Sequence, residues 1–285
     1  MEEFKKQISQ FRKTHHYRTK IVDGATFNYL LCGKGKKTIM FLVGGMGVSE
    51  LWMPYIKLLE NDYQILTFDY PFELKDNVSL AEGISKLLKA LDIPKVAIFG
   101  ASYGGYLGQI FAAAYPEQTE ALCLSSTAAF TKQTMDILAA GFGKKIKPML
   151  WMIRHLPYSL IKKVEKRSCM QKLDNATPEE TEYMEGLFSE VYRTYTRKLD
   201  LYITELLVDL LNVKPYTAKD FTALDGRVLL FFPAHDATFT PEMQKNLIEL
   251  MPNPKVVGNM EGGHVATFLR CEEYTDTVRE FLKEM

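Results

Sequence analysis

Apolar residues recur along this chain in runs of five or six that are nearly uninterrupted. Such runs are typical of strands buried on both faces of a parallel sheet. An earlier segment, residues 20–31, instead reads as two strands joined by an Asp23-Gly24 turn, a typical hairpin signal. The predicted buried strands occupy residues 38–43, 64–69, 95–99, 121–126, 227–232 and 255–260.

Helical patterns lie between these runs. Ser79 and Glu82 have the spacing of a capping box, which predicts a helix from Ser79 to about Leu91. Thr240 followed by Pro241 predicts a second helix start, with threonine as the N-cap. Alternating strands and helices indicate an α/β protein with a doubly wound, mostly parallel sheet.

One long segment breaks this alternation, because residues 130–219 contain no convincing strand pattern. Thr177 and Glu180 form another capping box, and apolar residues at helical spacing follow it at Met184, Leu187 and Val191. We therefore expect a core of residues 1–128 and 221–285, interrupted by a helical cap of residues 129–220.

Composition narrows the class of protein. The 285 residues include 35 Lys and Arg and 35 Asp and Glu, a balance that argues against general nucleic-acid binding. The four cysteines are far apart, which favours reduced thiols and a cytoplasmic location. The first 16 residues read as polar throughout, unlike a signal peptide, and no apolar run is long enough to span a membrane.

A Gly100-Ala-Ser102-Tyr-Gly104 motif lies between a predicted strand and a predicted helix. This context predicts a nucleophile elbow, a sharp turn that exposes the serine oxygen above the carboxyl edge of the sheet. The alternative is an ordinary glycine-rich loop. Given the flanking elements, we expect Ser102 to be a nucleophile.

A serine nucleophile needs a base, and a histidine needs a carboxylate to orient it. Of five histidines, His264 follows the last predicted strand in a small-residue loop, and the others suit structural roles better. Asp236 follows the strand before it and is the preferred carboxylate, although it could instead cap a turn. Asp69, at another strand end, is a second candidate that could instead shape its loop.

Ser102, Asp236 and His264, each on a strand-end loop and in this order, resemble the α/β-hydrolase fold superfamily with a cap inserted after the strand that follows the elbow. The resemblance implies an oxyanion hole from the amides of Tyr103 and Gly45, or Met46 if the register slips by one. The loop at Val43-Gly-Gly-Met-Gly47 is similar to the family's H-G-G-P-G pattern, with valine in place of histidine and methionine in place of proline. The resemblance also implies that the protein needs no metal and no organic cofactor.

The leading hypothesis is a serine hydrolase that cleaves a small or medium carboxylic ester through an acyl-enzyme. A prolyl-iminopeptidase-like aminopeptidase is the alternative, because the Ser-Tyr-Gly-Gly sequence resembles that branch and the acidic residues 174–190 could hold a substrate ammonium group. Thioesterase, lactonase and carbon–carbon hydrolase activities would use the same residues. A non-catalytic binding protein is the remaining alternative, and the triad argues against it.

The predicted cap carries an uneven charge. Residues 144–172 contain nine Lys and Arg and one Glu, interspersed with Met, Trp and Leu. Such a stretch can bind acidic lipids or the phosphates of a thioester carrier. The simpler interpretation, which the sequence favours, is a solvated face that complements the acidic residues beside it. Met149, Trp151, Met152, Phe188 and Tyr192 could line an acyl pocket or form the core of the cap.

Overall fold

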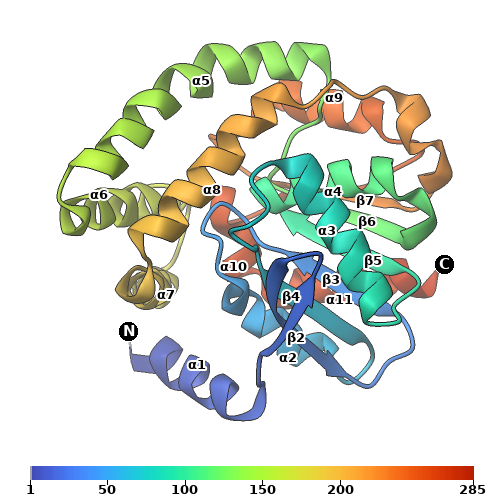
Figure 1. Ribbon diagram of the computed structural model, residues 1–285, viewed down its shortest axis with the longest axis horizontal. Helices are drawn as coiled ribbons and strands as arrows, with labels where there is room; N and C mark the ends of the chain where they lie inside the picture. The colour runs from blue at the N-terminus through green and yellow to red at the C-terminus, as the bar shows by residue number, and fades with distance from the viewer. Residues whose placement is uncertain (1) are drawn as a thin grey trace.

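The computed structural model describes residues 2–285, which form an eight-stranded sheet with helices on both faces (Figure 1). The strand order is β1-β2-β4-β3-β5-β6-β7-β8. All pairs from β4 to β8 are parallel, whereas β2 pairs antiparallel with β1 and β4. This confirms the predicted α/β class. The strands are β1 (Arg18–Val22), β2 (Ala25–Gly33), β3 (Thr38–Leu42), β4 (Gln64–Asp69), β5 (Val96–Ala101), β6 (Thr119–Ser125), β7 (Val228–Pro233) and β8 (Lys255–Met260).

The apolar runs form strands because both faces of the sheet are covered. Every residue of β3, β5 and β7 is buried. One apolar cluster fills the face covered by α3 and α4, and a second fills the face covered by α2 and α11 and includes buried residues of α1 and α7. The helices are α1 (Glu2–Thr14), α2 (Met53–Leu59), α3 (Asn77–Ala90), α4 (Tyr103–Ala114), α5 (Lys132–His155), α6 (Tyr158–Met170), α7 (Pro178–Thr194), α8 (Arg197–Asp209), α9 (Pro241–Leu250), α10 (Ala266–Leu269) and α11 (Cys271–Lys283).

Two expectations about helices were wrong. Asp76, not Ser79, is the N-cap of α3, because its carboxylate accepts a hydrogen bond of 2.8 Å from the Ser79 amide. The N-terminal segment is not polar throughout: it forms α1, and Phe4, Ile8 and Phe11 are buried along one face of that helix. These apolar residues recur every three or four positions, the period of an amphipathic helix. The predicted caps Thr177 of α7 and Thr240 of α9 are confirmed.

Helices α5 to α8 follow one another between β6 and β7, and α5, α6 and α7 lie beside the sheet rather than on it (Figure 1). Within residues 130–219 the structure contains helices and no strand. The hydroxyl of Tyr202 on α8 donates to the carbonyl of Pro71 at 2.6 Å, and the amide side chain of Asn77 donates to the carbonyl of Leu206 at 2.9 Å. These buried bonds attach α8 to the loop after β4 and to the start of α3.

Candidate active site

Ser102 occupies the turn between β5 and α4 in a conformation that few non-glycine residues adopt, with φ 54° and ψ −121°. Such strain persists only where the surroundings impose it, and it is frequent at functional sites. A Cβ atom on Gly104 would lie 2.3 Å from the carbonyl oxygen of Leu42 in β3. One on Gly100 would lie 2.3 Å from the Gly104 oxygen. The tight turn therefore requires both glycines, as the G-x-S-x-G motif predicts.

His264 and Asp236 are brought together from the loops after β8 and β7. The His264 Nδ1 atom lies 3.1 Å and 3.0 Å from the two carboxylate oxygens of Asp236. The Asp236 side chain is only 1% exposed and that of His264 is 9% exposed. The Thr238 amide also donates to Asp236 at 2.8 Å. An imidazole held in this way by a buried carboxylate has its Nε2 atom free for acid–base chemistry.

The Asp236 carboxylate remains ionised in spite of its burial. Burial alone would raise the pKa of this group, but its hydrogen bond and charge interaction with His264, together with the amides of Thr238 and Phe239, hold the pKa below its ordinary value. A carboxylate that stays charged orients the neighbouring imidazole and stabilises its protonated form.

Ser102 and His264 lie on loops at the same carboxyl edge of the parallel strands, where α/β proteins place their ligands. Within the described residues no hydrogen bond joins the two side chains. The Phe239 ring lies 5.6 Å from the His264 ring and 6.2 Å from that of Tyr106, one turn after Ser102. Catalytic hydrogen bonds are often loose before substrate binds, so this geometry is compatible with a Ser-His pair that closes later.

The loop after β3 lies directly beside the elbow. A Cβ atom on Gly44 would be 3.9 Å from the Cβ of Ser102. The loop is a tight turn in which the Gly47 amide donates to the Gly44 carbonyl at 3.0 Å, with Gly47 at φ 63°. Among residues 2–285 no hydrogen-bond acceptor is found for the Gly45 amide, and Tyr103 is the first residue of α4, where an amide has no helical partner. These two amides stay the predicted oxyanion donors, with Met46 as the alternative to Gly45.

Tyr70 is a supporting residue that sequence reasoning missed. Its buried hydroxyl donates to the Val43 carbonyl at 2.7 Å, at the position where the related pattern has histidine. The Tyr70 ring also contacts the Tyr103 ring edge-to-face, with centroids 5.8 Å apart. The tyrosine directly after β4 was the only available signal, since its partner is a backbone atom that no motif encodes.

Asp69, the second candidate carboxylate, shapes a loop. One of its oxygens accepts hydrogen bonds from the Ser49 amide at 3.1 Å and from the Ser49 hydroxyl at 2.7 Å. Its other oxygen accepts from the side chain of Asn28 at 3.1 Å. Both oxygens are therefore engaged on the far side of the loop that follows β3.

Three groups outside this site have the chemistry of metal ligands: His15, Cys32 and Glu60, whose ligand atoms lie within 4.8 Å of one another. The His15 Nε2 atom already forms a 2.8 Å hydrogen bond with Glu60, which accounts for two of the three groups without an ion. His235 is exposed, and His155 contacts Trp151 at the surface. Neither of these two histidines is part of the arrangement around Ser102.

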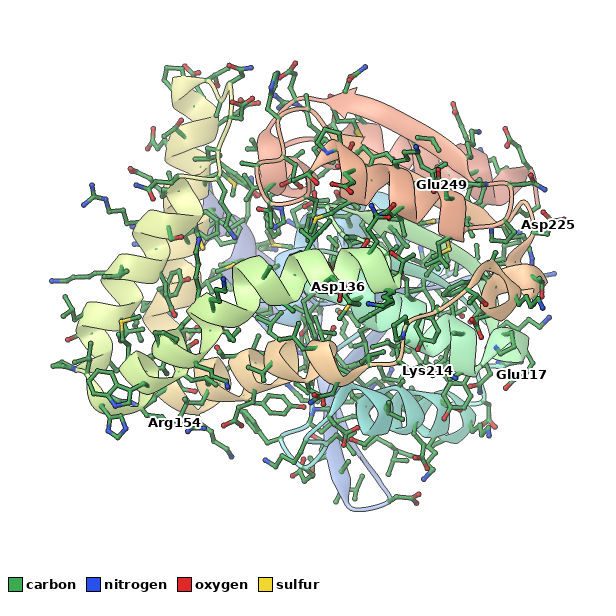
Figure 2. All side chains as sticks on the ribbon, turned by 90° about the horizontal axis from the view of Figure 1, so that it is seen from above. Glu117, Asp136, Arg154, Lys214, Asp225 and Glu249 are labelled. Carbon is green, nitrogen blue, oxygen red and sulfur yellow. The ribbon has the colours of Figure 1, made fainter. Side chains whose placement is uncertain are left out.

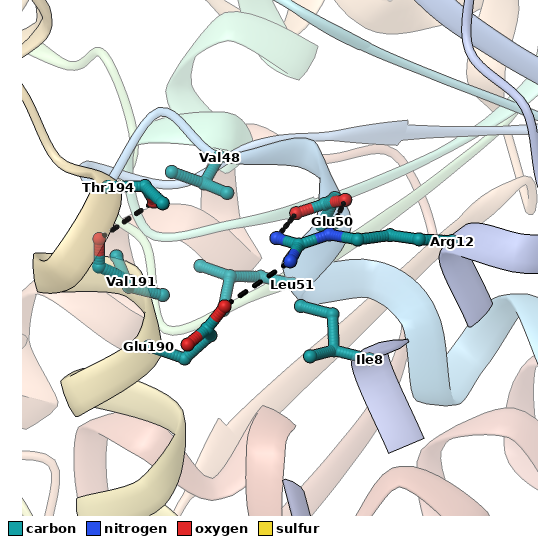
Figure 3. Close-up of a pocket in the computed structure, with 8 residues that line it drawn as sticks. All are labelled: Ile8, Arg12, Val48, Glu50, Leu51, Glu190, Val191 and Thr194. Atoms are coloured by element: carbon teal, nitrogen blue, oxygen red, sulfur yellow. Dashed lines mark hydrogen bonds and ion pairs between the residues drawn. The ribbon is translucent and has the colours of Figure 1, made fainter. Parts of the chain in front are cut away.

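Helix α8 covers the loop beside Ser102. A Cβ atom on Gly47 would be 2.7 Å from Ile203, and one on Gly45 would be 4.0 Å from Leu207. Ser102 itself is half-buried. A cavity of about 10 Å³, smaller than one water molecule needs, lies elsewhere between α1, α7 and the 3₁₀ helix Ser49–Trp52, where Arg12 bridges Glu50 and Glu190 (Figure 3). It is not a substrate pocket.

Known proteins with a similar sequence or structure have the same fold. A family model described as the α/β hydrolase fold matches residues 37–146. An enol-lactonase from Burkholderia xenovorans LB400 superposes with a TM-score of 0.75 at 16% identity, covering 93% of this chain and 100% of the other. An esterase from Thermogutta terrifontis gives 0.75 at 14% identity, covering 94% and 98%. The chain has the α/β-hydrolase fold.

A curated relative shares part of this fold. The chain is 34% identical over 106 residues to a poly(3-hydroxyalkanoate) depolymerase of Ectopseudomonas oleovorans. The match takes in 34% of this chain and 38% of the depolymerase, so less than two fifths of that relative is matched. The family-model match includes the elbow and the loop after β3 but ends before Asp236 and His264. The family-model match therefore carries no information on Asp236 and His264.

Proposed function

We propose that this chain is a serine hydrolase that cleaves a carboxylic ester. The observation that carries the proposal is the buried Asp236–His264 pair at the carboxyl edge of the sheet that also holds Ser102 in a strained turn. A strained backbone and a buried charge both lower stability, and both are frequent at catalytic sites. Catalysis at Ser102 would account for both. The names of the similar proteins, a depolymerase, an enol-lactonase and an esterase, support an acyl substrate.

In the proposed reaction, the Ser102 oxygen attacks the ester carbonyl while His264 Nε2 accepts its proton. Asp236 holds the Nδ1–H in place and stabilises the imidazolium. The amides of Tyr103 and Gly45 donate to the developing oxyanion. His264 then protonates the leaving alcohol. It next takes a proton from the water that attacks the acyl-enzyme, and it returns that proton to the Ser102 oxygen as the acid leaves.

We propose that residues 129–220 are a cap whose helix α8 lies over the substrate. Ile203 and Leu207 present apolar surface toward the glycine loop beside Ser102, which suits an apolar acyl or alcohol group. Because α8 also contacts Gly47 closely, substrate entry requires α8 or the loop to move, as lids do in other enzymes.

Two acidic residues of α7 are engaged in ion pairs, so the aminopeptidase alternative would have to use other acids among residues 174–190. Glu180 pairs with Arg270, and Glu190 pairs with Arg12 and Arg193. These carboxylates are therefore not free to hold a substrate ammonium group. Thioesters and lactones remain compatible with the same residues, since both present an acyl carbon to Ser102.

Hydrolysis of p-nitrophenyl acetate, butyrate and octanoate by the full chain tests the proposal. Ser102→Ala should lower kcat by about a thousandfold or more. Ser126→Ala is the matched control, because Ser126 is also a strand-end serine with positive φ (46°) and has no proposed role. A fluorophosphonate should label wild type and Ser126→Ala but not Ser102→Ala. Folded wild type that neither turns over esters nor takes the label would contradict the proposal and favour a binding protein.

A further inference from the structure

Exposed apolar side chains concentrate at one corner of the molecule. Among residues 4–285, leaving out 142, nine large hydrophobic side chains are exposed, and four of these belong to residues 151–164. Trp151 is 58% exposed, Leu160 51% and Val164 60%. The sequence allowed Trp151 and Met152 a place in the core of the cap, and the structure instead exposes both. We call residues 144–172 of α5 and α6 the basic corner.

The exposed residues of α6 form one stripe that mixes apolar and basic side chains. Leu160, Lys163, Val164 and Arg167 are all exposed and follow the i, i+3, i+4, i+7 spacing of a single helix face. The opposite side of the helix faces α7, where Lys166 donates to the Ser189 hydroxyl at 2.7 Å. Within the described residues, no side-chain hydrogen bond or ion pair joins the outward stripe to the rest of the fold.

Helix α5 carries a second stripe of the same kind. Lys144, Lys147, Trp151 and Arg154 are exposed at helical spacing, and this helix ends one turn before α6 begins. Figure 1 shows both helices at the outer rim, away from the sheet, and Figure 2 places Arg154 at an outer corner of the molecule. The two stripes therefore belong to consecutive helices at the outer rim of the molecule.

The acidic residues of α7 do not neutralise the basic corner. Of its nine Lys and Arg, only Arg154 forms an ion pair within the described part of the chain, with Glu205 of α8 at 2.8 Å. Lys162 donates to a backbone carbonyl of α7, and two α7 acids, Glu180 and Glu190, pair with arginines outside the corner. The corner's single acid, Glu165, is largely buried, and burial and the nearby Asp200 raise its pKa. The one ion pair of the basic corner in the described part of the chain is therefore with α8 rather than with α7.

We propose that the basic corner docks on an anionic lipid bilayer. Lys and Arg interleaved with Trp, Leu and Val are the composition of helices that lie in the membrane interface. The basic side chains would meet lipid phosphates while Trp151, Leu160 and Val164 enter the boundary of the acyl chains. None of the helices formed by residues 2–285 combines the length and apolarity needed to cross a bilayer, so this contact is peripheral. The proposal is independent of catalysis by Ser102.

Vesicle co-sedimentation of the full chain is the test. Wild type should bind vesicles of phosphatidylcholine with an equal part of phosphatidylglycerol, bind much less to phosphatidylcholine alone, and dissociate as salt is raised. Lys163→Glu with Arg167→Glu should weaken the partition coefficient by at least about thirtyfold, since each basic residue near an anionic surface contributes about 1 kcal/mol. Trp151→Ser with Leu160→Ser should weaken it by about tenfold or more.

Matched controls distinguish binding through the basic corner from non-specific electrostatic or hydrophobic binding. Lys132→Glu with Lys245→Glu makes the same charge change at exposed positions outside the corner, and Val78→Ser with Ile248→Ser removes exposed apolar groups elsewhere. Both should bind like wild type. Trp52 is buried, so a blue shift of tryptophan emission on binding should come from Trp151 and vanish in Trp151→Phe.

Four results would overturn the proposal. One is equal binding of wild type to neutral and anionic vesicles, or no binding to either. Another is a loss of binding with the control pairs equal to that with the corner pairs. The third is a dimer in solution that Trp151→Ser with Leu160→Ser dissociates, which would make the corner a contact between copies. Displacement by inorganic phosphate, but not by chloride at the same ionic strength, would indicate a single-phosphate site instead.

Discussion

The central strands and the basic corner use similar apolar side chains in opposite ways. Every residue of β3, β5 and β7 is buried, so each side chain there is constrained by neighbours on both faces of the sheet. In α5 and α6, Trp151, Leu160 and Val164 face outward. The same residue types therefore pack inside the protein in one region and are left exposed in the other, where we propose that they contact a membrane. Changes in the first region should disturb stability or catalysis, and changes in the second should be mild.

The largest effect is expected at the edge of the sheet. Asp236→Asn keeps the size of the side chain but removes the charge that orients His264, and kcat on p-nitrophenyl butyrate should fall by about a thousandfold to ten-thousandfold. Asp69→Asn is the matched control, because its carboxylate instead holds Ser49. That variant should lose stability while it keeps most of its kcat. Equal losses of kcat in both variants would contradict the assignment of Asp236.

Gly104→Ala should be the most damaging change to stability. The added methyl would lie 2.3 Å from the Leu42 oxygen and 2.9 Å from the Val43 oxygen, both in the backbone. Overpacking against backbone that cannot move should cost about 3 kcal/mol of unfolding free energy, visible as a lower urea midpoint. A loss below about 1 kcal/mol would mean that the elbow and β3 separate more easily than their burial indicates.

A buried pair of carboxyl groups should make the stability of helices α6 and α8 depend on pH. Glu165 on α6 and Asp200 on α8 are both largely buried, and burial raises the pKa of each. The Glu165 carboxyl thus holds a proton in the folded protein at pH values where the unfolded chain has released it. The contribution of Glu165 to the free energy of unfolding is fully present below the pKa of a glutamate in the unfolded chain, about 4.3. It is lost as the pH rises through the raised pKa of Glu165 in the folded protein.

Glu165→Gln should remove that loss. Between pH 5 and pH 9, the Tm of wild type should fall relative to Glu165→Gln by on the order of 2–4 °C. Glu185→Gln, at an exposed position of α7, should follow wild type across the same range. Parallel Tm curves for wild type and Glu165→Gln would show that α6 and α8 relax enough to hydrate the pair.

The sequence predicted the sheet well because each strand is a local apolar run, and it located Ser102 because the elbow needs small residues at fixed spacing. Other features depend on distant partners. Tyr70 acts on a backbone carbonyl, and Asp76 took the capping position because it lies one turn before Ser79. The choice between Asp236 and Asp69 also required the structure, since both follow a strand and only one faces His264. The exposure of Trp151 depends on which face of α5 packs against the rest of the protein, and the periodicity of the sequence alone did not determine this.

The smallest effect tests whether the two regions unfold together. Gly141 is an exposed residue inside α5, and a Cβ atom added there would meet nothing within 4 Å. Gly141→Ala should therefore stabilise α5 by about 1 kcal/mol, the reverse of Gly104→Ala, because alanine loses less conformational freedom in a helix. If α5 unfolds in the same transition as the sheet, Tm should rise by about 2–4 °C. Hydrogen exchange of the α5 amides measures the local effect. An unchanged Tm with slower exchange in α5 would contradict this expectation and show that these helices open before the sheet does.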